Sequence, residues 1–191
     1  MNIICSNMCN DQSCEKLYEI DLIEAQNIKE AGCPYCGGNL HKANYLRKPR
    51  GNDLKCTDKY EERLSFCCGK CRRRTTPKSC RFLGRKVYCS WSIVCSEIVK
   101  NSLMASDILI SSVIGASVRT ISRWRSWWQN KVGQSAIWYH LRVHITPTVD
   151  TTRLVSELAQ RFNITWQQPN NSITKLLNFL SPLSIRSNYP A

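Results

Sequence analysis

The sequence has few acidic residues and no long hydrophobic run. Its 191 residues include 14 acidic side chains against 27 lysines and arginines, which gives a formal net charge of +13. The least polar spans, residues 87–99 and 101–118, are short, rich in serine and interrupted by Glu97 and Asp107. A membrane-spanning helix needs about 20 apolar residues, and no charged and then apolar leader opens the chain, so we expect neither membrane insertion nor secretion. The excess of positive charge favours a polyanionic partner, above all nucleic acid.

Patterns that indicate catalysis are also missing from the sequence. It has no glycine-rich phosphate loop and no Ser-His-Asp or Cys-His arrangement. After position 100 the acidic residues are limited to Asp107, Asp150 and Glu157, and no alternating βαβ pattern surrounds them. We therefore expect a protein that is not an enzyme.

Cysteine, in contrast, is abundant, with 12 residues. Because nothing indicates export, we expect a reduced, cytoplasmic and nucleoid-associated protein whose thiols are metal ligands or buried apolar groups. The sequence assigns no role to eight of them: Cys5, Cys9, Cys14, Cys56, Cys67, Cys80, Cys89 and Cys95. The first three could form a second metal site, but they lack a Cys-x-x-Cys pair and a clear fourth ligand.

Two Cys-x-x-Cys pairs predict a zinc ribbon. The predicted ligands of a Zn²⁺ ion are Cys33, Cys36, Cys68 and Cys71. Four thiolates from two tight turns suit the tetrahedral geometry of this ion. Gly37 and Gly69 fit the backbone conformations that such turns need, since glycine adopts them without strain. The alternative is that the pairs arise by chance in a cysteine-rich chain.

Residues 37–67, between the pairs, form a longer gap than compact ribbons use, so we predict an extended hairpin. Its second strand covers residues 60–68, where side chains alternate between two faces. We expect one face to carry Tyr60, Leu64, Phe66 and Cys68, and the outward face to carry Glu61, Arg63, Ser65 and Cys67. This alternation selects Cys68 as the third ligand.

Positive charge is concentrated around the ribbon. Residues 1–30 carry six acidic and two basic residues, whereas residues 31–100 carry five acidic and sixteen basic residues. Within the acidic lead, residues 15–29 predict a short amphipathic helix that buries Leu17, Ile20, Ile23 and Ile28. After the second cysteine pair, the cations predicted to contact DNA phosphates are Arg72, Arg73, Arg74, Lys78, Arg81, Arg85 and Lys86. The alternative for this run is a solvated face.

Residues 106–131 predict a helix-turn-helix. Ile108, Leu109, Val113 and Ile114 mark a first helix, Gly115 ends it, and Ser117 can cap a second helix. Apolar residues at three- and four-residue steps would bury one face of that second helix: Val118, Ile121, Trp124 and Trp128. Its outer face would enter a major groove, with base contacts predicted for Arg119, Thr120, Ser122 and Arg123 and a DNA contact for Ser117. Any two helices joined through glycine would share this outline.

The expected fold class is α+β, a small β-rich zinc ribbon followed by a mainly α-helical region. Four segments are predicted: an acidic N-terminal segment (1–30), a zinc ribbon with a basic flank (31–88), a helix-turn-helix (89–132) and a C-terminal helical region (133–191). In the last segment we expect helices over residues 135–143, 151–162 and 172–180, with Asp150 as the cap of the second.

The order of the four-cysteine ribbon, the arginine run and the helix from Ser117 to Trp124 resembles the amino-terminal DNA-binding region of bacterial insertion-sequence transposases. The resemblance covers residues 31–131 and implies recognition of DNA ends or an operator in a mobile element. Such transposases continue into a ribonuclease-H-like domain, in which three carboxylates hold two metal ions for strand transfer. The present sequence departs from that pattern.

We therefore expect a zinc-dependent, non-catalytic protein that binds double-stranded DNA as an accessory or regulatory factor of a mobile element. An alternative is a DNA-binding subunit or truncated form of an active transposase, whose catalytic half is a separate chain. A further alternative is a zinc ribbon that serves RNA binding or protein assembly. The protein partner would be a second copy of this chain or a separate transposase.

Overall fold

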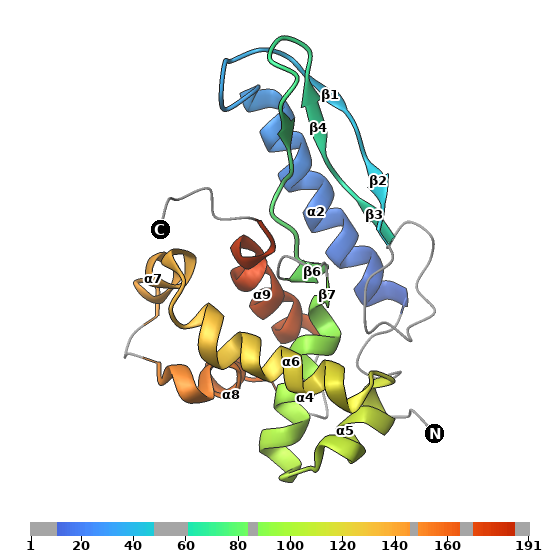
Figure 1. Ribbon diagram of the computed structural model, residues 1–191. Helices are drawn as coiled ribbons and strands as arrows, with labels where there is room; N and C mark the ends of the chain where they lie inside the picture. Colours follow the sequence, from blue (N-terminus) through green and yellow to red (C-terminus); the bar gives the residue numbers. More distant parts are fainter. Residues whose placement is uncertain (1–10, 48–60, 84–87, 146–148, 165–169, 186–191) are drawn as a thin grey trace.

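A long N-terminal helix and a narrow ribbon of strands form an arm that rises from a body of shorter helices (Figure 1). The computed structural model describes residues 11–47, 61–83, 88–145, 149–164 and 170–185. The arm consists of α2 (Asp11–Ala31) and strands β1 to β5, and the body contains α4 to α9. Small antiparallel sheets followed by a mostly helical region make this an α+β fold, as the sequence predicts.

The ribbon strands are short and antiparallel. Two sheets are formed: β1 (Leu40–Lys42) pairs with β4 (Phe66–Cys68), which pairs with β5 (Arg74–Thr75), and β2 (Tyr45–Leu46) pairs with β3 (Glu62–Arg63). The register of the first sheet places Leu40 opposite Cys68. The predicted pairing of the two cysteine segments through a hairpin is therefore confirmed, although residues 48–60 lie outside the described residues.

Both faces of the strand that leads to Cys68 are covered. As the alternation predicts, the buried residues include Leu64, Phe66 and Cys68. The expectation that Arg63 and Ser65 face solvent is wrong, because both are buried as well. Arg63 donates a hydrogen bond to the carbonyl oxygen of Pro77, and Ser65 accepts one from the guanidinium of Arg74. The chain that follows the second cysteine pair thus covers the strand face that carries Arg63 and Ser65.

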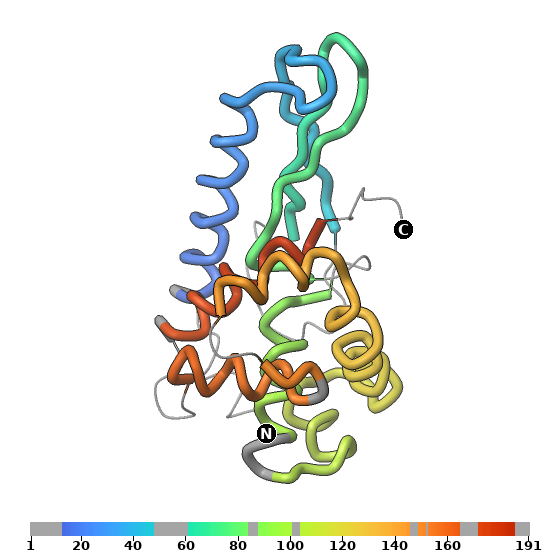
Figure 2. The backbone as a smooth tube through the Cα atoms, turned by 90° about the vertical axis from the view of Figure 1, so that its left-hand side faces the viewer, coloured from blue at the N-terminus to red at the C-terminus, as the bar shows by residue number. Residues whose placement is uncertain are grey.

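Helix α2 is longer than the predicted helix over residues 15–29 and runs beside the ribbon (Figure 2). Its buried stripe includes Leu17, Asp21 and Ala25 at four-residue steps. Ala25 belongs to a small hydrophobic cluster with the ribbon residues Leu40, Leu64 and Phe66. Ile23 is 61% exposed, so the prediction that it is buried is wrong. The stripe through Asp21 faces the ribbon, which places Ile23 on the solvent side.

The chain enters the body through a two-stranded sheet of β6 (Phe82–Leu83) and β7 (Tyr88–Cys89). The helices that follow are α4 (Ser90–Leu103), α5 (Asp107–Ile114), α6 (Val118–Trp127), α7 (Ala136–Arg142), α8 (Leu154–Arg161) and α9 (Asn170–Leu180). Helix α6 continues into a π-helical turn (Trp128–Val132), a 3₁₀ turn (Thr151–Arg153) precedes α8, and a second 3₁₀ turn (Ser181–Ser184) follows α9. The predicted C-terminal helices are thus present, with shifted ends.

Helix α4 lies at the centre of the body and packs against α5, α6 and α8. Large aromatic side chains fill the core around it, and Trp91, Trp124 and Trp138 are completely or almost completely buried. The helix begins at Ser90, because the preceding Tyr88 and Cys89 pair with β6. Over the described part of the chain, no helix combines the length and the apolar character that crossing a membrane requires.

A buried ion pair connects the arm to the body. Arg81 and Asp21 are 0% and 1% exposed, and the Arg81 Nε lies 2.8 Å from Asp21 Oδ2. The other Asp21 oxygen accepts the backbone N–H of Cys80 at 2.7 Å, and Arg81 also donates to the carbonyl oxygen of Glu62 at 2.8 Å. The guanidinium stacks on Tyr18 at 4.7 Å. Arg81 therefore belongs to the interior, and its predicted contact with DNA phosphate does not fit this burial.

We expect the Asp21–Arg81 pair to be a major determinant of stability. Arg81→Met should lower the free energy of unfolding by about 3 to 5 kcal/mol, because it leaves a buried carboxylate without its cation. Lys78→Met is the matched control, since Lys78 pairs with Glu24 at 3.1 Å while its side chain is 38% exposed. This control should cost less than about 1 kcal/mol. Urea unfolding followed by circular dichroism measures both, and equal midpoints for Arg81→Met and wild type would contradict the assignment.

Candidate metal centre and nucleic-acid surface

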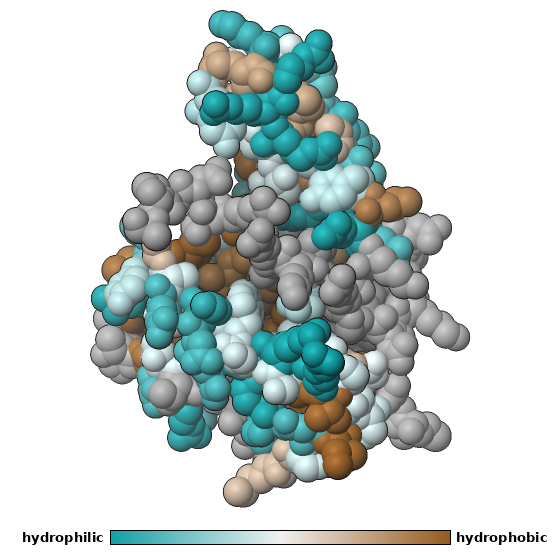
Figure 3. Space-filling view, viewed as in Figure 1, coloured by the Kyte–Doolittle hydropathy of each residue, from teal (hydrophilic) through white to brown (hydrophobic). Residues whose placement is uncertain are grey.

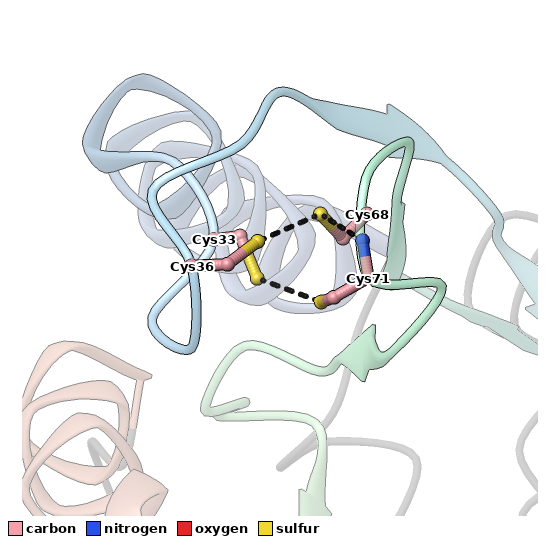
Figure 4. A group of neighbouring side chains, drawn as sticks. All are labelled: Cys33, Cys36, Cys68 and Cys71. Atoms are coloured by element: carbon pink, nitrogen blue, oxygen red, sulfur yellow. Dashed lines mark hydrogen bonds between the residues drawn. The ribbon is translucent and has the colours of Figure 1, made fainter.

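The four predicted zinc ligands converge at the end of the arm (Figure 4). Their sulfur atoms all lie within 4.8 Å of one another. The Sγ atoms of Cys33 and Cys71 are 3.6 Å apart, and those of Cys36 and Cys68 are 3.5 Å apart. A Zn–S distance of about 2.3 Å in a tetrahedral site corresponds to sulfur separations of about 3.8 Å. The cluster therefore fits a zinc ion, and the nine cysteines that the structure describes are free of disulfides.

The two cysteine turns have the same backbone geometry. In the first, Cys33 accepts a hydrogen bond from the N–H of Gly37 at 2.8 Å and donates its own N–H to Gly38 at 2.9 Å. In the second, Cys68 accepts from the N–H of Arg72 at 3.1 Å and donates to Arg73 at 3.0 Å. The residue after each pair has a left-handed backbone, with φ of 67° at Gly37 and 60° at Arg72. Two equivalent turns thus face each other across the sulfur cluster.

Glycine serves different purposes at the two turns. The prediction for Gly37 is confirmed by its positive φ, and the open space around its Cβ position leaves conformation as the reason. Gly69 has no such φ, but an added Cβ would lie 2.8 Å from Nε2 of His41, so the reason there is space. Gly38 was missed by the sequence argument. Its Cβ would lie 3.2 Å from the Cys68 sulfur, so glycine allows the backbone to lie directly against the cluster.

Backbone amides favour a thiolate at Cys68. The N–H groups of Cys71 and Lys70 point at its sulfur over donor–acceptor distances of 3.4 and 3.3 Å. The hydrogen bond from Cys71 and then that from Lys70 lower the pKa of the Cys68 thiol to about 6. The thiolate is the form that binds metal, so Cys68 is the ligand of this turn that ionises more readily. At Cys71, the other ligand of the turn, the backbone hydrogen bond from Arg73 is outweighed by burial and by hydrogen bonds with the neighbouring thiols, which raise its pKa to about 12.

The remaining described cysteines are not arranged as ligands. Four of them lie in the main hydrophobic core: Cys14, Cys80, Cys89 and Cys95. Burial raises the pKa of the Cys80 thiol, which keeps that thiol protonated. Of the second metal site considered above, Cys14 is a core residue, whereas Cys5 and Cys9 lie outside the described residues, as does Cys56.

The arginines of the run that follows the second cysteine pair differ in their contacts with the rest of the protein. Arg72 and Arg73 are exposed, and the Arg73 guanidinium lies 4.7 Å from the ring centroid of the exposed Tyr35. Arg74 is also exposed, but it donates to the Ala43 carbonyl oxygen at 2.9 Å and to Ser65 Oγ at 2.8 Å. Lys78 pairs with an acid of α2. The predicted phosphate contacts Arg85 and Lys86 lie outside the described residues.

The two helices and the glycine turn predicted within residues 106–131 are present. Helix α5 ends at Gly115, whose φ is 74°, and α6 begins after Ser117, whose side chain accepts a hydrogen bond from the N–H of Thr120. Helix α6 buries Ile121 and Trp124. The exposed residues of α6 are Val118, Arg119, Ser122, Arg123 and Ser126, so the prediction that Val118 is buried is wrong. Thr120 is half-buried, with its hydroxyl 2.9 Å from that of Ser117.

The apolar residues of α5 are not all buried as expected. Ile110 and Ile114 face the core, but Ile108 is 75% exposed and Leu109 is 47% exposed. Figure 3 shows a hydrophobic patch in the region of α5, in keeping with the exposure of these two apolar residues. Ile110 and Ile114 are four residues apart, so the side of α5 that packs on the body is turned away from Ile108.

An ion-pair network, which the sequence argument missed, ties the three helices α4, α5 and α6 together. Arg125 of α6 binds both carboxylate oxygens of Asp107, at 2.8 and 3.0 Å, and lies 3.7 Å from Glu97 of α4. Hydrogen bonds from Arg125 hold the pKa of Asp107 below its ordinary value. The cap of α5 is Ser106, and the carboxylate of the half-buried Asp107 is bound by Arg125.

Comparison of the chain with protein-family models, curated proteins and solved structures finds no significant match. The candidate sites are therefore a cluster of four cysteine thiols that fits a metal ion and, separately, the pair of helices α5 and α6. The similarity to transposase DNA-binding regions remains a resemblance in the order of motifs.

We expect the wild-type protein, purified under reducing conditions, to contain one zinc ion per chain. Cys68→Ser should lose the ion and unfold the ribbon, because the small cluster around Ala25 and Phe66 is too limited to fold alone. Cys67→Ser is the matched control, since its half-buried sulfur lies outside the cluster and zinc should be retained. Elemental analysis decides the matter, and full zinc content in Cys68→Ser would refute the ligand assignment.

The equivalence of the two turns predicts opposite effects of substitutions at matched positions. Gly37→Ala should destabilise the zinc-loaded protein by about 1 kcal/mol, because a left-handed backbone is strained for any residue with a Cβ. Arg72→Gly should stabilise it by up to about 1 kcal/mol for the same reason. Urea unfolding of the zinc-loaded variants measures both changes. A stabilised Gly37→Ala variant would show that the backbone of this turn is not left-handed in solution.

Proposed function

We propose that this protein is a zinc-dependent, non-catalytic factor that binds double-stranded DNA, in which α6 enters the major groove and the ribbon contacts the phosphate backbone. The observation that carries the proposal is that α6 has one side packed on the body and one side exposed to solvent. Ile121 and Trp124 hold the helix against the body, while Arg119, Ser122 and Arg123 project from its exposed side. Arginine pairs with guanine edges and serine accepts several bases, so this side has the chemistry of base recognition.

The contacts that hold α6 against the neighbouring helices favour a role in DNA recognition. A recognition helix has to be presented rigidly, with its partner helices packed behind it. Arg125 joins α6 to α5 and α4 through Asp107 and Glu97, and the ring of Trp124 meets that of Tyr88 edge to face at 5.8 Å. The inner side of α6 is thus committed to packing, which leaves its outer side available for a ligand.

The ribbon adds a second cationic surface. Arg72 and Arg73 follow directly on a metal ligand, so a folded zinc site would hold their backbone in a fixed position. Cations in fixed register suit phosphate contacts, which contribute affinity and salt dependence but little sequence preference. By the resemblance in motif order, the DNA target would be an end or operator of a mobile element, and a second copy or a separate transposase would be the protein partner.

The alternative of an active transposase chain is less well supported by the environment of the acidic residues. Asp107 is engaged with Arg125 and Lys100, and Glu157 accepts the backbone N–H of Asp150 at 3.1 Å. Two-metal strand transfer needs carboxylates that converge on ions about 3.5 to 4 Å apart. These side chains are instead engaged in local structural contacts, which favours a binding role.

A second candidate function is RNA binding through the ribbon. It is favoured by Tyr35, which is 47% exposed on the first cysteine turn beneath the Arg73 guanidinium. An exposed aromatic ring next to arginine can stack on unpaired bases. Competition of single-stranded RNA against duplex DNA distinguishes the two functions, since RNA should displace the duplex only if this second function holds.

A binding-site selection with random duplexes tests the proposed function. We expect an enriched sequence, for which Arg119→Ala and Arg123→Ala each lose about 1 to 3 kcal/mol of binding free energy, with little effect on unrelated duplexes. Lys175→Ala, which removes an exposed charge from α9, is the control and should bind both kinds of duplex like the wild type. If no sequence is enriched, or if all three variants lose affinity equally for every duplex, α6 is not a recognition helix.

A further inference from the structure

The two cationic surfaces lie on the same side of the molecule. The β4–β5 hairpin, which carries Arg72 and Arg73 in its turn, and helix α6 both face the viewer in Figure 1 and both lie at the right in Figure 2. In the view of Figure 3, the surface is hydrophilic at the end of the arm and again over α6. A single rod-shaped polyanion lying along this side would therefore meet both surfaces.

The length of α2 sets the separation between them. Helix α2 has 21 residues, which corresponds to about 31 Å at 1.5 Å per residue. The metal turns lie at its C-terminal end, and α6 lies beyond its N-terminal end in the long direction of the molecule (Figure 1). One turn of B-DNA spans about 34 Å and about 10 base pairs. The two surfaces are thus spaced by at least about one helical repeat of a duplex.

We propose that one continuous duplex runs along this side and is contacted twice, by α6 in the major groove and by Arg72 and Arg73 on the backbone about one helical turn away. This inference rests on the proposed function and adds the geometry of the target. The complete site is a duplex of about 20 base pairs, whereas α6 alone would need only about one turn.

The spacing is maintained by the joint between arm and body. Asp21 of the arm binds Arg81 and the N–H of Cys80, while Ser184, which follows α9, meets the backbone N–H of the neighbouring Ser79 at 2.7 Å. Helix α2 also packs against α9. Because the contacts of Asp21 with Arg81 and Cys80 are buried, the arm is fixed to the body. Two contacts on one rigid molecule act as a single bivalent event, so the second contact adds affinity only on a duplex long enough to reach it.

The arginines of the second cysteine turn are not equally suited to the proposed backbone contact about one helical turn away from α6. The interactions of Arg74 with Ala43 and Ser65 bind it to the ribbon itself. Arg72 and Arg73 are exposed, and the stacking of Arg73 on Tyr35 limits the freedom that this side chain would lose on binding phosphate. The test therefore uses Arg72 and Arg73 and leaves Arg74 in place.

The experiment measures the affinity of the full-length, zinc-loaded protein for labelled duplexes of increasing length. The duplexes carry the selected sequence in 12, 16, 20, 24 and 30 base pairs, extended to either side. For the wild type we expect the affinity to rise at least about tenfold when extension on one particular side brings the whole duplex to about 20 base pairs. Longer duplexes should bring no further large gain. Hydroxyl-radical footprinting should show two protected regions about 10 base pairs apart.

The double variant Arg72→Ala/Arg73→Ala separates the two contacts. It should bind the 12-base-pair duplex like the wild type, lose the gain from extension, and reduce the salt slope on the long duplex by about 2. The matched control Lys16→Ala/Lys29→Ala removes two exposed charges from α2 and should keep the dependence on length.

The outcomes distinguish the inference from the proposed function. Sequence-specific binding with equal wild-type affinity at every length would overturn the two-contact inference and leave the proposed function intact. A gain from extension that persists in Arg72→Ala/Arg73→Ala would also overturn it, since the outer contact would then lie elsewhere. Failure to bind any of the duplexes would overturn both.

Discussion

The buried pair of Asp21 and Arg81 is the interaction on which the arrangement of this molecule depends. Its two side chains are almost completely enclosed, so the cost of desolvating them is offset only while both are present and hydrogen-bonded. Asp21 belongs to α2, whereas Arg81 lies where the chain passes from the ribbon into the body. The contact therefore decides how the arm is oriented, and with it the position of the metal turns relative to α6.

The cluster of four cysteines makes a second, more local contribution. The ribbon has strands of only two or three residues and a small hydrophobic cluster that it shares with α2. Four thiolates on one ion would provide cross-links that this small core lacks, because binding of the metal is coupled to folding. The matching backbone of the two turns, with a left-handed residue after each cysteine pair, shows how two distant segments present their sulfurs in the same way.

The helix-turn-helix and the ribbon differ in how their cations are used. On α6, Arg125 points inward and is bound by Asp107 and Glu97, whereas Arg119 and Arg123, on the other side of the helix, are exposed. In the ribbon and the segment that follows it, Arg63 and Arg81 are buried, whereas Arg72 and Arg73 are exposed. The formal charge of +13 thus includes arginines that stabilise the fold as well as those that remain available for a polyanion.

The sequence by itself determined the local features. Two Cys-x-x-Cys pairs identified all four members of the cluster, alternation distinguished Cys68 from Cys67, and Gly115 with Ser117 located the turn between α5 and α6. These features are readable because they depend on backbone conformation and on spacing within a few residues. The same rules correctly indicated an α+β fold with a ribbon before the helices.

Only the tertiary structure decided which charged and apolar residues are inside. Arg81 looked like one more member of a basic run, yet it is buried because Asp21, sixty positions earlier in the chain, lies against it. Ile23 and Ile108 looked like core residues, yet they are exposed because the packed sides of their helices run through Asp21 and Ile110 instead. A hydrophobic or charged pattern defines a face of an element, but the partner that covers this face comes from a distant segment, and local spacing holds no information about that partner.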